Sequence, residues 1–120
     1  MDIIEVLKAL ADETRVRILN VLYKETLCVC DLEEILKISQ SNASRHLAKL
    51  RNARLIISEK QAQWVYYRVD EKILERYSFL KELLAKELDK SPQCQKDFRR
   101  LKKYRDCGGS CERIVKIDDE

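Results

Sequence analysis

Residues 31–50 read DLEEILKISQSNASRHLAKL, a segment in which one helix start closely follows another. Asp31 and Glu34 have the spacing of a capping box, which predicts the start of a short helix. Ser39 or Ser41 can cap a second helix. The apolar side chains of that second helix recur at i, i+4 and i+7 and would face the core: Ala43, Leu47 and Leu50. Two short helices with a tight turn between them, the second polar and basic outside, are typical of a helix-turn-helix.

The residues that follow are rich in β-forming side chains. Residues 55–58 and 64–69 predict two strands, and residues 59–63 between them read as a hairpin tip. A hairpin with a basic tip directly after a helix-turn-helix is typical of a winged helix. The sequence therefore predicts a mainly α fold with a small β-hairpin, a winged helix-turn-helix.

Helical spacing also covers most of the remaining chain. It predicts helices over residues 3–10, from Asp12 onward, over residues 71–89, and from Ser91-Pro92 to about residue 105. The apolar stripe of residues 71–89 is too wide for the core of so short a chain, so we expect a homodimer through the terminal helices. We expect residues 1–90 to form a winged-helix DNA-binding and dimerisation domain. Residues 91–120 would add a C-terminal helix and a cysteine-containing tail with a frayed acidic end.

Composition agrees with a helical fold and excludes several classes of protein. The chain has 120 residues, 38% of them charged and 45% hydrophobic, with two glycines and one proline. So few helix-breaking residues argue against a β-sandwich, and the apolar content argues against disorder. The longest runs without charge are far shorter than a membrane span, and the N-terminus lacks the features of a signal peptide. We expect a cytoplasmic location, where the five cysteines would be ligands, reactive thiols or core residues.

Positive charge is concentrated in the predicted helix-turn-helix and wing. Residues 39–68 carry six basic residues against one acidic residue, whereas the whole chain has a net charge of only +3. A solvated charged face would explain a basic run elsewhere. Because this block coincides with the predicted motif, it indicates a surface that binds a polyanion.

Four ordered motifs between residues 5 and 70 resemble the ArsR/SmtB family of metal-responsive repressors. They are Leu7–Leu19, Leu27–Leu32, Ser44–Arg51 and Trp64–Val69. The second of these, with its Cys-Val-Cys, is similar to the metal-site signature of the arsenical-resistance branch. The resemblance implies a winged-helix homodimer that represses transcription and leaves its operator when a thiophilic ion binds.

Three positions depart from that family pattern. Glu33 stands where the arsenical branch often has a cysteine, and Arg54 and Ala62 stand where the family commonly has glycine. If the backbone keeps a positive φ at the last two positions, each substitution costs about 1 kcal/mol.

The outward side of the second helix and the predicted wing supply the expected contacts to double-stranded operator DNA. Arg45 could read the O6 and N7 acceptors of guanine, and Lys49, Lys60 and Arg68 suit phosphates. His46 is the only histidine, and we expect it to contact DNA or to be structural. The full set of expected DNA-binding residues is Gln40, Ser41, Asn42, Ser44, Arg45, His46, Lys49, Lys60, Gln63 and Arg68.

The cysteines supply the expected inducer site. In extended backbone the side chains of Cys28 and Cys30 share one face, and a helix capped by Asp31 would favour their thiolates. Trivalent arsenic prefers three thiolates, so Cys107 or Cys111 could complete the site. The Gly-Gly-Ser between them makes a loop flexible enough to bring both sulfurs to one ion. We expect As(III) or Sb(III) as inducer and no organic cofactor. With a single histidine, a zinc, nickel or cobalt site of the family's histidine-rich type is not expected.

Other functions remain open at this point. The same fold could sense oxidation or persulfides through its thiols, or respond to Cd, Pb or methylated arsenicals. A metal-carrying protein that does not bind DNA is a further alternative. An enzyme is not expected, because no paired carboxylates and no nucleophile with an adjacent base stand out. A membrane partner is not expected either.

Overall fold

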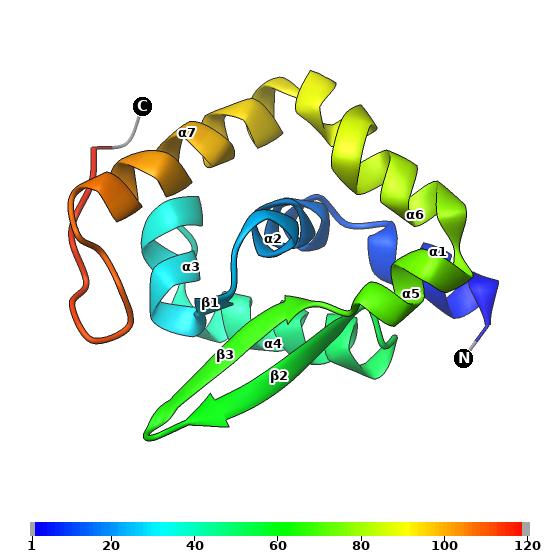
Figure 1. Cartoon of the computed structure of the whole chain (residues 1–120), viewed down its shortest axis with the longest axis horizontal. Coiled ribbons are helices and arrows are strands. Elements are labelled where there is room, and N and C mark those ends of the chain that lie inside the picture. Colours follow the sequence, from blue (N-terminus) through cyan, green and yellow to red (C-terminus); the bar gives the residue numbers. More distant parts are fainter. Residues whose placement is uncertain (1, 119–120) are drawn as a thin grey trace.

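The computed structural model describes residues 2–118, in which helices form most of the molecule and the hairpin of a small sheet projects from one side (Figure 1). The elements are α1 (Ile3–Leu10), α2 (Glu13–Lys24), β1 (Leu27–Cys28), α3 (Val29–Leu36), α4 (Gln40–Asn52), β2 (Ile56–Gln61), β3 (Trp64–Val69), α5 (Glu71–Arg76), α6 (Ser78–Glu82), the π-helical turn η1 (Leu83–Glu87), the 3₁₀ turn η2 (Leu88–Lys90) and α7 (Pro92–Asp106). No helix within residues 2–118 is both long enough and apolar enough to cross a bilayer.

The predicted helix-turn-helix and wing are confirmed, but the predicted hairpin tip over residues 59–63 is too long, because β2 stays paired with β3 as far as Gln61. The Ser39 side chain caps α4 by accepting a hydrogen bond from the backbone N–H of Asn42, and Ala43, Leu47 and Leu50 are buried. β2 and β3 pair antiparallel from Ile56–Val69 to Gln61–Trp64, which leaves a two-residue connection at the wing tip. α4 and the hairpin lie on the same side of the molecule (Figure 1).

A third strand, β1, was not predicted from the sequence. Leu27 and Cys28 pair antiparallel with Tyr67 and Tyr66, so the strand order is β1-β3-β2. Two residues are too few for an alternating pattern, and β1 forms because β3 offers its free edge there. This pairing fixes Cys28 at the start of α3.

Helix α3 begins three residues earlier than predicted. Cys28 is its N-cap, and Asp31, which we expected to be the cap, is the third helical residue. The Asp31 carboxylate accepts a hydrogen bond of 3.1 Å from the backbone N–H of Cys28. A side chain inside the helix thus pairs with a backbone N–H at the helix start. Cys30 therefore lies in the first turn of α3 and not in extended backbone.

The single helix predicted over residues 71–89 is wrong. The backbone leaves helical geometry at Tyr77 (φ −123°, ψ 95°), and the segment divides into α5, α6, η1 and η2. One straight helix could not bury the whole wide apolar stripe. After the break, the buried leucines lie at i, i+4 and i+8 and pack with the core: Leu80, Leu84 and Leu88.

Helix α7 has the predicted start, with Ser91 as N-cap and Pro92 at the first helical position. It packs against α2 and α3. The Arg17 guanidinium on α2 holds the buried Asp97 carboxylate of α7 with hydrogen bonds of 2.8 and 3.0 Å. This pair fixes α7 to α2.

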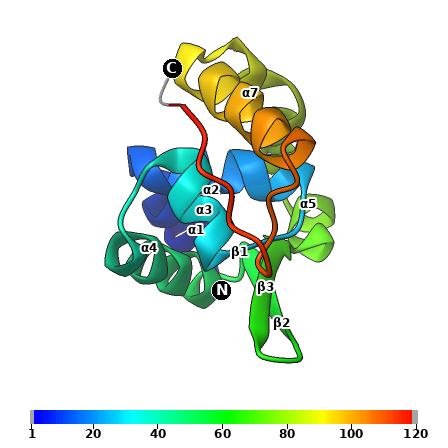
Figure 2. The same ribbon diagram turned by 90° about the vertical axis from the view of Figure 1, so that its left-hand side faces the viewer.

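The tail after α7 is not frayed within residues 107–118. It folds back and runs along α3 (Figure 2). The backbone N–H of Ile117 donates to Glu34 on α3 at 2.7 Å, and the Lys37 ammonium donates to the carbonyl of Ile117 at 2.8 Å. The last two residues of the expected frayed end, Asp119 and Glu120, lie outside the described residues.

Candidate functional site

The outer face of α4 presents most of the predicted DNA contacts. The side chains of Gln40, Ser41, Arg45 and Lys49 are exposed, and those of Asn42 and Ser44 are half-buried. The Arg45 guanidinium donates to the Asn42 side-chain oxygen at 2.5 Å. That bond holds Arg45 near the start of α4. In known complexes, the N-terminal residues of the recognition helix are the ones that contact base edges.

His46 does not face outward, and the expectation that it would is wrong. It is 4% exposed, and its Nδ1 lies 3.3 Å from the Arg15 guanidinium of α2. Burial lowers the pKa of His46. The nearby Asp12 carboxylate acts to raise it, but the positive charges of Arg45, Arg15 and Lys49 act in the same direction as burial, and the pKa is lowered. Arg15 also donates to the carbonyls of Ala9 and Lys8, so these contacts join α4 to α2 and α1.

The wing carries the remaining predicted contacts. Lys60, Gln63 and Arg68 are all exposed on it. The Arg51 guanidinium donates to the Ser58 hydroxyl at 3.3 Å and so links the end of α4 to β2. Arg54 and Ala62 have φ values of 62° and 56°, which are the left-handed conformations that favour glycine.

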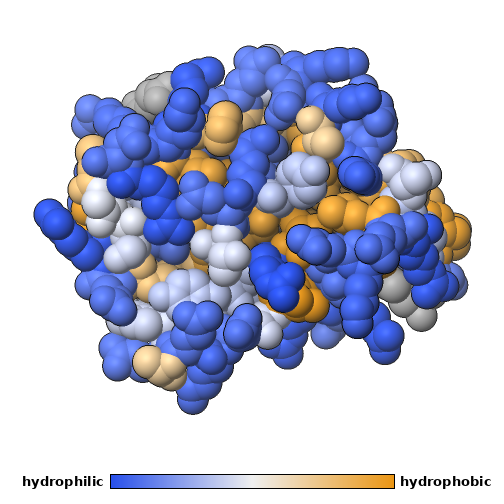
Figure 3. Space-filling view, viewed as in Figure 1, coloured by the Kyte–Doolittle hydropathy of each residue, from blue (hydrophilic) through white to orange (hydrophobic). Residues whose placement is uncertain are grey.

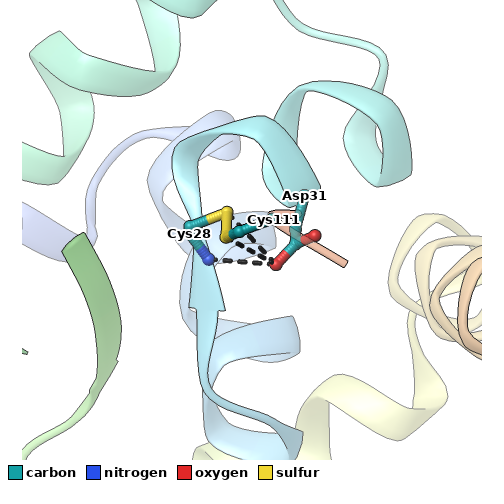
Figure 4. Close-up of side chains that lie close together, drawn as sticks. All are labelled: Cys28, Asp31 and Cys111. Carbon is teal, nitrogen blue, oxygen red and sulfur yellow. Dashed lines mark hydrogen bonds between the residues drawn. A yellow bond between two sulfur atoms is a disulfide. The ribbon is translucent and has the colours of Figure 1, made fainter. Parts of the chain in front are cut away.

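Two of the predicted thiol ligands come together from distant parts of the chain. Cys28 and Cys111 are 83 residues apart and form a disulfide with a Cα–Cα distance of 6.2 Å (Figure 4). This distance is in the range typical of disulfides. Both side chains are buried, with 3% and 4% exposed.

Asp31 lies against this cysteine pair. Its Oδ2 is 3.4 Å from the Sγ of Cys28 and 3.6 Å from the Sγ of Cys111 (Figure 4). Its other oxygen accepts a hydrogen bond of 2.6 Å from the Tyr104 hydroxyl of α7. Burial and this carboxylate raise the pKa of Tyr104, so the phenol stays protonated and donates. We call Cys28, Asp31 and Cys111 the clasp, because they join α3 to the tail.

The other cysteines do not join the clasp. Cys30 is half-buried in α3, and burial together with the carboxylates of Glu33 and Asp31 raises the pKa of its thiol. Cys94 is buried at the start of α7. Cys107 is exposed, although only three residues separate it from the buried Cys111. The loop between those two residues does not bring both sulfurs to one place.

Gly109 explains why that loop is held. Its backbone N–H donates to the Tyr104 carbonyl at 2.8 Å, and the Arg105 guanidinium donates to its carbonyl at 3.0 Å. A Cβ atom at Gly109 would lie only 2.5 Å from the Tyr104 ring. The tail can therefore cross the ring closely only because residue 109 has no side chain.

Glu34 forms a second link between α3 and the tail. Its carboxylate is 5% exposed and receives the Lys37 ammonium, the Lys116 ammonium and the backbone N–H of Ile117. Burial acts to raise the pKa of Glu34, but the hydrogen bonds from Lys37 and Ile117 outweigh it, and the pKa is lowered. Glu34 is therefore ionised at neutral pH.

Sequence reasoning missed Asp31 and Tyr104 as members of the site. Asp31 directly follows the Cys-Val-Cys motif, so its position was a usable signal, but its capping role alone was considered. Tyr104 lies 73 residues away, and nothing local distinguishes it from a core tyrosine.

Comparisons with known proteins agree with the fold. The family model described as bacterial regulatory protein, arsR family, matches residues 12–58. The arsenic resistance transcriptional regulator ArsR1 of Pseudomonas putida is 48% identical over 65 residues, 53% of this chain and 51% of that protein. A cadmium resistance transcriptional regulatory protein CadC homolog of Staphylococcus aureus is 44% identical over 72 residues, 59% of this chain and 60% of that protein. The chain thus spans between half and two thirds of the length of these relatives.

Solved structures show the same architecture. HlyU from Vibrio cholerae has 36% identity and a TM-score of 0.58, with 69% of this chain and 91% of that chain covered. A second HlyU structure, described as reduced, has 37% identity and a TM-score of 0.57, with 67% and 85% covered. A Mycobacterium bovis domain described as a homodimeric winged helix-turn-helix has a TM-score of 0.61 at 23% identity, with 72% and 82% covered.

One relative is matched over nearly its whole length. An HTH-type transcriptional regulator of Methanocaldococcus jannaschii is 36% identical over 81 residues, 66% of this chain and 91% of that protein. Together with the family model and the winged helix-turn-helix, this match identifies the protein at the level of its family. The chain belongs to the arsR family of bacterial regulatory proteins.

Proposed function

We propose that the protein is a transcriptional repressor that binds operator DNA through α4 and the wing and leaves it when As(III) or Sb(III) binds cysteine thiolates. The observation that carries this proposal is the position of the clasp. Cys28 is the N-cap of α3, and α3 is the helix that leads directly into α4. An ion that pulls on Cys28 acts on the helix-turn-helix itself.

The DNA-binding part rests on charge and exposure. Arg45 is the proposed base-reading residue, because its paired donors match guanine in the major groove. Lys49, Lys60 and Arg68 are proposed phosphate contacts, which would give affinity without sequence information. His46 would act indirectly, by holding α4 against α2.

The homodimer rests on an exposed apolar patch. Four large apolar side chains of α1 and α6 are 37 to 54% exposed: Ile3, Ile4, Leu7 and Phe79. Orange surface gathers at the end of the molecule where α1, α5 and α6 lie (Figure 3). A second copy that covers this patch would form a symmetric dimer, in which each of the two α4 helices could contact one half-site of the operator. Leu7→Glu should give a monomer by light scattering and weaken operator binding.

The metalloid part rests on thiol chemistry. Arsenous acid exchanges hydroxides for thiolates, As(OH)₃ + 3 RSH → As(SR)₃ + 3 H₂O, with no change of oxidation state. Reduced Cys28 and Cys111 would supply two sulfurs. The third is proposed to come from Cys30, with Cys107 as the alternative. Because Cys30 lies in the first turn of α3, recruiting it requires that turn to unwind, and this would move α4.

The test uses reduced protein and a fluorescent duplex from the region upstream of its own gene. Arsenite should raise the dissociation constant for the duplex about tenfold or more. Cys28→Ser and Cys111→Ser should bind the duplex but respond weakly or not at all, whereas Cys94→Ser should respond like the parent. If arsenite releases the Cys28→Ser and Cys111→Ser variants as readily as the parent, the proposal is wrong.

Thiol oxidation is a second candidate function, favoured by the Cys28–Cys111 disulfide itself. Glutathione disulfide would accept the two electrons and two protons of the thiols and leave as two glutathione molecules. A structural relative described as reduced HlyU is consistent with thiol chemistry in such proteins. If oxidised glutathione changes operator affinity and arsenite does not, oxidation is the signal.

A further inference from the structure

We propose that Glu34, Lys37 and Ile117 are positioning residues for operator binding, because together they hold the turn that joins α3 to α4. We call these three residues the turn cluster. The inference rests on the proposed function, since it concerns operator binding by α4, and it deepens that function by giving the tail a part in it. It involves no cysteine and no bound ion.

The turn is short, so few torsion angles set the direction of α4. Helix α3 ends at Leu36 and Ser39 is already the N-cap of α4, which leaves Lys37 and Ile38 between them. Lys37 has φ 55° and ψ 50°, a left-handed conformation that glycine usually adopts at the end of a helix. The strain of a lysine there is offset where its side chain makes contacts that glycine cannot make.

Those contacts form a closed ring of hydrogen bonds between α3, the turn and the tail. The Lys37 ammonium donates to Oε2 of Glu34 at 2.5 Å and to the carbonyl of Ile117 at 2.8 Å. The backbone N–H of Ile117 donates to the same Glu34 oxygen at 2.7 Å. Because Glu34 is buried and ionised, its bonds are charge-assisted and strong. A rotation of the turn at Lys37 would break two of the three bonds.

The tail is itself anchored, so it can brace the turn. The side chain of Ile117 is 7% exposed and packs with the core, and Cys111 is buried against the start of α3. Figure 2 shows the tail lying along α3 between these points. From the other side, Arg17 on α2 donates to the Leu36 carbonyl at 2.9 Å. The last turn of α3 is thus held from both α2 and the tail, while the exposed Lys37 takes its hydrogen bonds from the turn cluster.

Charge gives the test a clear sign. Glu34→Gln removes a negative charge, so electrostatics alone would tighten binding to DNA. Loss of the turn cluster would instead weaken binding to the operator, because the first residues of α4 must reach base edges in the major groove. The two effects act in opposite directions, so a weaker operator complex of Glu34→Gln indicates positioning.

The test measures fluorescence anisotropy under reducing conditions, with the operator duplex and with a duplex of scrambled sequence. Lys37→Met and Glu34→Gln should each raise the dissociation constant for the operator about fivefold or more, and change that for the scrambled duplex by less than about twofold. Lys37→Met should also leave the salt dependence of operator binding unchanged, whereas loss of a direct phosphate contact would reduce its slope by about one. Lys103→Met is the matched control, because Lys103 on α7 also bonds the tail, at Asp118 (3.3 Å), but lies outside the turn cluster.

Ile117→Pro tests the tail itself, because proline lacks the N–H that bonds Glu34. It should weaken operator binding as Glu34→Gln does. Ile114→Pro is its control, since Ile114 is an exposed tail residue whose backbone N–H makes no hydrogen bond within residues 2–118. Lys37→Arg keeps the charge and the donors, and it should bind the operator within about threefold of the parent even if another variant unfolds.

Hydrogen exchange of the backbone amides of residues 37–39 gives a readout that needs no DNA. Exchange should become about tenfold faster in Lys37→Met and Glu34→Gln, but not in Lys103→Met. The proposal is overturned if exchange at these amides is unchanged, or if Lys37→Met and Glu34→Gln bind the operator as tightly as Lys103→Met does. If the parent itself does not bind the operator duplex, the proposed function fails, and hydrogen exchange still decides whether the turn cluster holds the turn.

Discussion

Replacement of Gly109 by alanine should detach the tail from α3 without altering any cysteine or any DNA-facing side chain. The new Cβ would lie 2.5 Å from two carbons of the Tyr104 ring and 2.7 Å from a third, closer than packed atoms approach. Tyr104 cannot turn aside freely, because its ring is fully buried and its hydroxyl is bonded to Asp31. Either the ring or the tail must move.

The structure allows the cost to be worked out in two parts. Overpacking at a buried site costs about 1–3 kcal/mol. Loss of the hydrogen bond from Tyr104 to the charged Asp31 adds about 1.5–3 kcal/mol if the ring moves. We expect Gly109→Ala to lower the free energy of unfolding by about 3 kcal/mol, which for a chain of this size lowers the melting temperature by about 12 °C.

The assay is thermal unfolding followed by circular dichroism under reducing conditions, so that no disulfide contributes. Gly108→Ala is the matched control. A Cβ there would meet only the flexible Arg113 side chain at 3.5 Å, and its φ of +86° predicts a cost of about 1 kcal/mol. A second measurement is the alkylation rate of Cys111, which is 4% exposed and should react faster once the tail moves. If Gly109→Ala is no less stable than Gly108→Ala, and Cys111 stays protected, our account of the tail fails.

Three further results are expected. Arg54→Gly and Ala62→Gly should each raise the free energy of unfolding by about 1 kcal/mol by relieving a positive φ; unchanged urea midpoints would contradict this. The pKa of Glu34 is lowered from its ordinary value of 4.5. The stability that ionised Glu34 contributes to the folded protein is therefore complete above pH 4.5 and is lost as pH falls through the lowered pKa. Glu34→Gln should therefore cost about 2 kcal/mol at pH 7 and flatten the loss of stability between about pH 5 and 3; equal acid sensitivity would refute this. Lys60→Gln on the wing should reduce the slope of a plot of log binding constant for the operator against log salt concentration by about one per chain. Lys86→Gln is the control, because Lys86 is exposed on η1, outside α4 and the wing, and this substitution should leave the slope unchanged.

The parts of the fold that were predictable depend on neighbours in the chain. Capping residues and helical spacing predicted α4, strand-forming runs predicted the wing, and Ser91-Pro92 predicted the start of α7. The break at Tyr77 was not predicted, because the apolar stripe alone does not show which part of it a finite core can bury.

The predictable part of the candidate site has the same limit. Cysteines in the Cys-Val-Cys motif could be chosen from their spacing, but their partners could not. Cys28 meets a residue 83 positions away, and Asp31 meets one 73 positions away. A flexible Gly-Gly-Ser loop was expected to join Cys107 with Cys111, whereas packing of Gly109 on Tyr104 separates them.

The bond between Cys28 and Cys111 also turns the DNA-binding part of the protein into a closed ring. Residues 28–111 contain α3, α4 and the wing, whose tip at Ala62 and Gln63 is exposed. Exposed loop tips are preferred sites of proteolytic cleavage. A single cut at the wing tip of the oxidised protein would leave two fragments joined by one covalent bond. They would run as one band on a denaturing gel until a reductant is added, so limited proteolysis reports the state of this bond directly.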